Sequence, residues 1–100
     1  MKRIIEGGSA ATIYNITMTS ADTEYFQALP KNTKKVEFRC RGEYDIRYAF
    51  EAGKVKTPVS PYRTLKSKEV KSEWNLTLSG QTLYVACADA GQVVELEVWV

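Results

Sequence analysis

The chain contains no histidine. Histidine is the commonest general base, a usual member of catalytic triads and the commonest metal ligand, so the most frequent routes to catalysis and metal binding are missing. Cysteine is also scarce: Cys40 and Cys87 stand alone, with no C-x-x-C spacing and no third ligand near either. A zinc site is therefore not expected. No pair of carboxylates stands out as a catalytic dyad, and we predict neither enzyme activity nor a cofactor.

An excess of charge and long apolar runs are missing as well. The formal net charge is only +2, which argues against a dedicated nucleic-acid-binding protein. No apolar run approaches the roughly 18 residues that a membrane helix requires, and the opening MKRIIEGGSAAT lacks the apolar region of a signal peptide. We therefore expect neither membrane nor nucleic acid among the partners. We expect the chain to be made and kept in a reducing compartment, or released from it by lysis.

The length and the first residues indicate the domain organisation. One hundred residues is the size of one domain. Gly7, Gly8 and Ser9 form a flexible joint, and from Thr12 the sequence turns to β-branched and aromatic residues. We predict a flexible N-terminal arm, residues 1–10, and a single β-sandwich domain, residues 11–100.

The stretch KKVEFRCRGEYDIRYAF, residues 34–50, alternates between apolar residues at even positions and charged residues at odd positions. A period of two indicates strands with one face in the core. A hairpin around Gly42 would place Phe38 opposite Ile46, and it would give outer pairs of opposite charge (Arg41 with Glu43, Arg39 with Asp45, Glu37 with Arg47). A sandwich corner at Gly42, where the chain crosses to a second sheet, is the alternative.

Further strands are expected at residues 23–28, 62–65 and 70–78, with turns at 30–33, 67–69 and 79–80 and a long surface loop at 51–61. The final segment predicts a hairpin with the connection 89–92, in which Val85 faces Leu96 and Tyr84 faces Glu97. No stretch has helical spacing with caps. Seven or eight short strands indicate an all-β fold, an antiparallel β-sandwich of jelly-roll or immunoglobulin-like type, with a small barrel as the alternative.

The two cysteines fall in the apolar rows of predicted strands, as an inter-sheet disulfide would require. The pattern departs from the immunoglobulin one, because no Trp follows Cys40 at a strand's distance and Val85, not Tyr, lies two residues before Cys87. We predict buried free thiols that pack as small hydrophobes.

Four aromatic residues are candidates for a binding surface: Trp99, Tyr84, Trp74 and Tyr62. They suit the anchors of a protein–protein contact, a sugar-binding platform, or ordinary core positions. Two groups of lysines (Lys31, Lys34, Lys35 and Lys66, Lys68, Lys71) with interleaved aromatics suggest an oligonucleotide-binding barrel as a further alternative. Solubility is the favoured explanation, because Glu69 and Glu73 interrupt the second group.

The last strand carries apolar residues on both faces, including Val93 and Trp99 on one and Leu96 and Val98 on the other. A bare edge of this kind recruits other chains. The strand is therefore expected inside a sheet with its second face covered, or in a subunit interface. Together with the arm at the other end, this favours a building block that packs against neighbours.

Three segments, TSADTEYFQALPKNTKKVEFRCR, YDIRYAF and SGQTLYVACADAGQVVELEVW, resemble the small β-sandwich proteins that phages and prophages encode among their virion genes. The resemblance covers most of residues 12–100, and MKRIIEGG is extra to it. It implies a non-enzymatic virion role, as a capsid decoration or an accessory head or tail component. Such proteins act as homo-oligomers or on a lattice of capsid or tail proteins. They are made in the bacterial host cytoplasm and reside in the virion.

A carbohydrate-binding module, such as a tail-borne adhesin, is the alternative function. It requires two or three coplanar aromatic rings on one exposed face. Under the virion hypothesis, Trp99→Ala is expected to abolish assembly while the monomer stays folded, since a Trp at the centre of an interface typically contributes more than about 2 kcal/mol.

Overall fold

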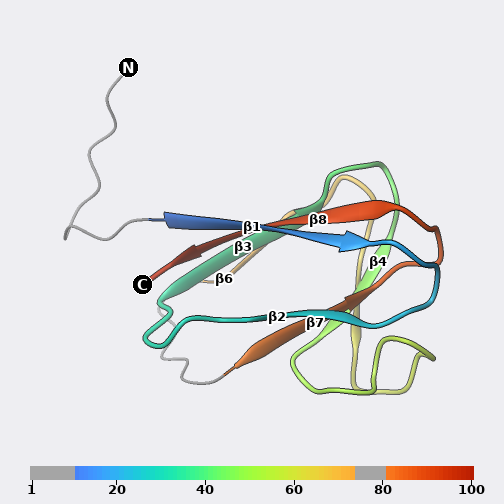
Figure 1. Ribbon diagram of the computed structural model, residues 1–100, viewed down its shortest axis with the longest axis horizontal. Helices are drawn as coiled ribbons and strands as arrows, with labels where there is room; N and C mark the ends of the chain where they lie inside the picture. Colours follow the sequence, from blue (N-terminus) through green and yellow to red (C-terminus); the bar gives the residue numbers. More distant parts are fainter. Residues whose placement is uncertain (1–10, 74–80) are drawn as a thin grey trace.

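The computed structural model describes residues 11–73 and 81–100, and these residues form two four-stranded antiparallel sheets packed as a sandwich (Figure 1). The predicted all-β sandwich is confirmed. The arm at 1–10, Trp74, the rest of the strand expected to end at residue 78 and the 79–80 turn lie outside the described residues. The strands within them are β1 (Ala11–Met18), β2 (Tyr25–Ala28), β3 (Lys35–Cys40), β4 (Ile46–Ala49), β5 (Arg63–Leu65), β6 (Lys71–Glu73), β7 (Thr82–Ala86) and β8 (Gln92–Trp99).

The strand order is that of a jelly roll. One sheet has the order β1-β8-β3-β6 and the other β2-β7-β4-β5, so β1 pairs with β8, β2 with β7, β3 with β6 and β4 with β5. An immunoglobulin-like sandwich keeps several consecutive strands together in one sheet. Here β4 and β5 are the one consecutive pair that does so among the described strands. Of the predicted types the jelly roll is therefore correct, and the immunoglobulin-like sandwich and the barrel are wrong.

The hairpin around Gly42 is wrong, and the corner is correct. Strand β3 pairs with β8 and β6 in one sheet, whereas β4 pairs with β7 and β5 in the other. Both edges of β3 are thus occupied by distant strands, and Arg39 and Arg41 meet Glu95 of β8 instead of Asp45 and Glu43. The corner is tight at Gly42, where an added Cβ would lie 2.7 Å from the side-chain oxygen of Gln92.

The predicted hairpin between β7 and β8 is also wrong. Strand β8 lies between β1 and β3, whereas β7 lies in the other layer between β2 and β4 (Figure 1). The last strand is therefore inside a sheet, as one alternative stated, but its second face is not covered as that alternative expected, because Glu95 and Glu97 line an open groove. Tyr84 and Trp99, expected on the same face of one hairpin, instead point outward from opposite sheets, since their neighbours Leu83, Val85 and Val98 are the buried ones.

The core between the sheets follows the alternation of the sequence. Phe38, Ile46, Val85 and Leu96 are fully buried, and Phe38 meets Tyr48 edge to face at 4.9 Å between ring centroids. Tyr44 and Phe50 extend the same row of even positions, yet both are exposed, because β3 ends at Cys40 and β4 at Ala49. Strand parity decides burial only while the strand continues.

A second, smaller cluster lies on the outer side of the β2-β7-β4-β5 sheet. Val55, in the expected 51–61 loop, is buried against Ala49 of β4 and Ala86 of β7, with Tyr62 and Tyr84 packed around them. Arg47 holds this loop by donating from Nε to the carbonyl oxygen of Val55 at 2.8 Å. The loop is therefore a fixed cover over that sheet.

Both cysteines are buried free thiols, as predicted. Burial raises the pKa of the Cys87 thiol, whose Sγ also donates to the carbonyl oxygen of Asp45 at 3.4 Å. Because the unfolded thiol ionises at lower pH than the folded one, the stabilisation is present at neutral pH and is lost as the pH rises into the alkaline range.

We expect the free energy of unfolding in urea to fall more steeply between neutral and alkaline pH in the wild type than in Cys87→Ala. Parallel curves for the two proteins would contradict this.

Candidate functional site: the outer face and free edge of the β1-β8-β3-β6 sheet

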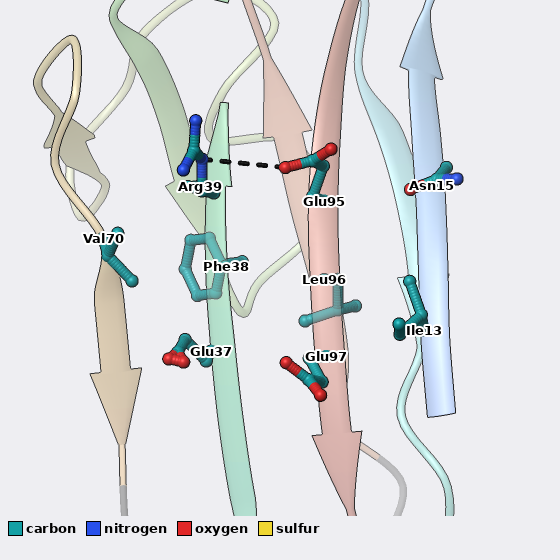
Figure 2. A pocket seen from close by; sticks show the side chains of 9 residues that line it. All are labelled: Ile13, Asn15, Glu37, Phe38, Arg39, Val70, Glu95, Leu96 and Glu97. Atoms are coloured by element: carbon teal, nitrogen blue, oxygen red, sulfur yellow. Dashed lines mark ion pairs between the residues drawn. The ribbon is translucent and has the colours of Figure 1, made fainter. Parts of the chain in front are cut away.

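A shallow groove of about 420 Å³ lies on the outer face of the β1-β8-β3-β6 sheet. Figure 2 shows it with β1 at one side, β8 and β3 in the middle and β6 at the other side. Side chains from odd positions of three strands line it, because even positions turn inward to the core. They include Ile13 and Asn15 of β1, Glu95 and Glu97 of β8, and Glu37 and Arg39 of β3.

The strand register arranges these side chains in two rows across the sheet. In one row Asn15 faces Glu95, and Glu95 faces Arg39. The Glu95 carboxylate lies 3.6 Å from Nε of Arg39 and accepts a hydrogen bond of 2.8 Å from Nε of Arg41. This row is electrostatically paired, although its side chains are largely exposed, so each ion pair contributes little to stability.

The other row contains an unfavourable pair. Ile13 faces Glu97, and Glu97 faces Glu37 directly across the sheet, as the side chains in Figure 2 show. Within the described part of the chain, neither carboxylate forms an ion pair with a cation. Like charges directly opposite each other on adjacent strands are destabilising.

We expect Glu97→Gln to raise the free energy of unfolding by about 0.2–1 kcal/mol, because it removes this repulsion and keeps the side-chain shape. The matched control is Glu95→Gln on the same strand, which removes the partner of Arg39 and Arg41 and should leave stability unchanged or lower it. Urea unfolding at low ionic strength measures both. A Glu97→Gln protein less stable than Glu95→Gln would contradict the assignment.

Exposed apolar side chains lie on both sides of this charged centre. Ile13 of β1 is 67% exposed and Val70, just before β6, is 51% exposed. Both line the groove. The face is thus acidic in the middle with an isoleucine at the β1 edge.

Strand β1 is the most unusual edge in the described part of the molecule. It has eight residues, ATIYNITM, with no charge and no proline. The other sheet edges are short: β2 has four residues, and β5 and β6 have three each, with Arg63 and Lys71 on them. Shortness and charge are the usual protection of a sheet edge against pairing with another chain, and β1 has neither.

The structure separates the four aromatic candidates. Trp99 is half-buried on the same outer face as the groove, with Nζ of Lys35 lying 4.3 Å from its ring centroid. Tyr84 is half-buried on the opposite outer face, and Tyr62 packs beside Val55. Trp74 lies outside the described residues. The three described candidates do not form one surface, and the Trp99→Ala expectation stays a prediction.

The sequence reasoning missed the β1 edge and Ile13. The signal was visible in TIYNITMTS, the expected first strand, which lacks any charged residue. Its position at a sheet edge was not visible, because the sequence does not state which strands have two neighbours.

The carbohydrate-binding alternative requires coplanar rings on one exposed face, whereas the aromatic rings in close contact in the described residues are inclined to one another. Phe26 and Tyr84 have ring centroids 6.1 Å apart with planes inclined at 52°. Tyr48 and Phe50 are inclined at 81°, and Tyr48 is buried. No coplanar pair occurs among the ring contacts in residues 11–73 and 81–100.

In the residues that the structure describes, no group of three or more cysteine or acidic side chains is arranged to hold a metal ion. No helix in those residues is long and apolar enough to cross a bilayer. Comparison of the chain with protein-family models, with curated proteins and with solved structures finds no match.

Proposed function

We propose that this protein is a non-enzymatic structural component of a phage virion, a capsid decoration or an accessory head or tail protein that works through protein–protein contacts. The observation that carries the proposal is the unprotected β1 edge, eight uncharged residues long. An edge of this kind exposes a free monomer to unwanted pairing with other chains, whereas in a protein that assembles it provides the contact.

Two further observations support the virion setting. Jelly-roll sandwiches recur in viral capsid proteins, and three segments of the sequence resemble small phage virion proteins. One fold is shared by proteins with many functions. The jelly roll therefore supports the virion role only together with the β1 edge. The partners under this proposal are further copies of the chain and the capsid or tail proteins that carry them.

The proposal is tested on particles. A tagged chain is expressed in the phage-producing host, and particles are purified by density-gradient centrifugation and then washed at high salt. We expect the chain to remain with the particles in a fixed stoichiometry to the major head or tail protein. A chain that is abundant in the lysate but absent from washed particles would overturn the proposal.

A further inference from the structure

We propose that a second copy of this chain binds along β1, so that the two β1 strands pair antiparallel about a two-fold axis and join two four-stranded sheets into one. The inference deepens the proposed function, on which its role in a particle rests, by naming the partner and the contact.

Half of the main-chain groups of β1 point away from its neighbour β8. The N–H of Arg41 donates to the carbonyl oxygen of Val93 at 2.8 Å, so Val93 turns its main-chain groups toward β3. Successive residues of an antiparallel strand turn these groups to opposite sides. The main-chain groups that β8 turns toward β1 are therefore those of Val94, Leu96 and Val98. Their hydrogen-bonding partners on β1 are Ile16, Tyr14 and Thr12, respectively. The residues of β1 whose N–H and C=O groups face the open edge are Ala11, Ile13, Asn15 and Thr17.

The edge of β1 can pair with the same edge of a second copy. The strand has no charged residue, so two copies meet without repulsion. An isologous two-fold contact is also the commonest symmetry of homo-oligomers. The edges of the other sheet offer much less to a second copy, since β2 has only four residues and β5 only three.

The direction of the main-chain groups also limits the register. Outward-facing residues of one copy must meet outward-facing residues of the other. The register centred on Tyr14 is the one that pairs all four outward-facing residues of β1, whereas a register centred on Asn15 pairs only three of them. It sets Ile13 opposite Asn15 of the second copy, Thr12 opposite Ile16, and Ala11 opposite Thr17. β-branched and aromatic cross-strand neighbours are favourable in such pairs.

Tyr14 adds a side-chain contact at the centre of the interface. It is half-buried and packs against the main core of its own chain. At the two-fold axis it meets Tyr14 of the second copy on the inner side of the joined sheets. The core would therefore continue across the interface, with an aromatic pair at its centre.

The first test uses proline at an outward-facing N–H. Asn15→Pro removes a donor that serves only the second copy, so the monomer fold is retained. Asn15→Ala is the matched control, because it removes the same side chain and keeps the N–H. Sedimentation equilibrium over a wide concentration range should show a wild-type dimer, a similar dimer for Asn15→Ala, and a dissociation constant raised about tenfold or more for Asn15→Pro.

A second pair of variants keeps the test decisive if Asn15→Pro does not fold. Ile13→Lys places a charge beside the two-fold axis, and Phe26→Lys places one on the other sheet at a position with nearly equal exposure, 65% against 67%. We expect Ile13→Lys to be a folded monomer and Phe26→Lys to dimerise like the wild type. A dimer that survives both Ile13→Lys and Asn15→Pro would overturn the β1 contact.

The register is tested by disulfide crosslinking. In the register centred on Tyr14, the two Cα atoms at position 14 are about 4.5 Å apart, within disulfide range. Those at position 12 are about 14 Å apart, because the strands run in opposite directions. Tyr14→Cys should form an intermolecular disulfide under mild oxidation, and Thr12→Cys should not. The reverse result would overturn the register.

Failure of this inference is distinguishable from failure of the proposed function. A chain that is monomeric at all concentrations, yet is incorporated into particles equally well with and without Ile13→Lys, overturns the inference and leaves the virion role intact. A β1-dependent dimer that never enters particles overturns the virion role and leaves the self-pairing intact. An added peptide with the β1 sequence that binds while the chain itself stays monomeric overturns the choice of a second copy as partner.

Discussion

Phe38→Ala is expected to lower the free energy of unfolding by about 3–5 kcal/mol. Phe38 is 1% exposed and comes from the centre of β3. Its ring meets Tyr48 of β4 at 4.9 Å with an interplanar angle of 81°, so it joins the two sheets across the core. The substitution removes the ring, leaves a cavity that close-packed strands fill only in part, and breaks the edge-to-face contact.

Urea unfolding monitored by circular dichroism measures this effect, with Phe26→Ala as the matched control. Phe26 is 65% exposed on the outer side of β2, and its ring contacts Tyr84 at 6.1 Å. We expect the control to lose less than about 1 kcal/mol. For a domain of this length, Phe38→Ala should lower the thermal midpoint by more than about 12 °C. Equal losses in the two variants would show that Phe38 does not fill the core as described.

Arg47→Met is expected to destabilise the fold by about 2–3 kcal/mol and to open the 51–61 loop. The Arg47 side chain is only 15% exposed. Its Nε donates to the carbonyl oxygen of Val55 at 2.8 Å, and its Nη2 donates to that of Lys56 at 3.3 Å and to Oδ1 of Asp22 at 2.9 Å. The substitution keeps the apolar stem but leaves the Val55 carbonyl without this donor and releases the loop from β4.

The two consequences are measured separately. Chemical unfolding gives the loss of stability, and limited proteolysis gives the exposure of the loop, for which we expect faster cleavage between residues 51 and 61. Arg39→Met is the control, since Arg39 is 52% exposed with its Nε 3.6 Å from Glu95. It should lose less than about 1 kcal/mol and show unchanged cleavage. Unchanged loop cleavage in Arg47→Met would contradict the role of this side chain.

The sequence by itself determined that strands lie within residues 34–50 and 82–99 and, along each strand, which side chains enter the core. Phe38, Ile46, Val85 and Leu96 are buried as their parity predicts, and Cys40 and Cys87 are buried free thiols. Parity can be read directly because successive Cβ atoms of a strand point to opposite faces, which is a property of each strand alone.

Only the tertiary structure decided which strands pair. Main-chain hydrogen-bonding groups are the same in every strand, so the alternation that places Phe38 inside does not distinguish Ile46 from Leu96 as its partner across the ladder. The opposite charges around Gly42 fitted a hairpin, yet Arg39 and Arg41 are paired with Glu95 of a strand distant in sequence. For the same reason the β8 strand is interior and β1 is the edge. Whether a strand is an edge depends on how many neighbours it has, and the fold sets that number through contacts between residues far apart in the chain.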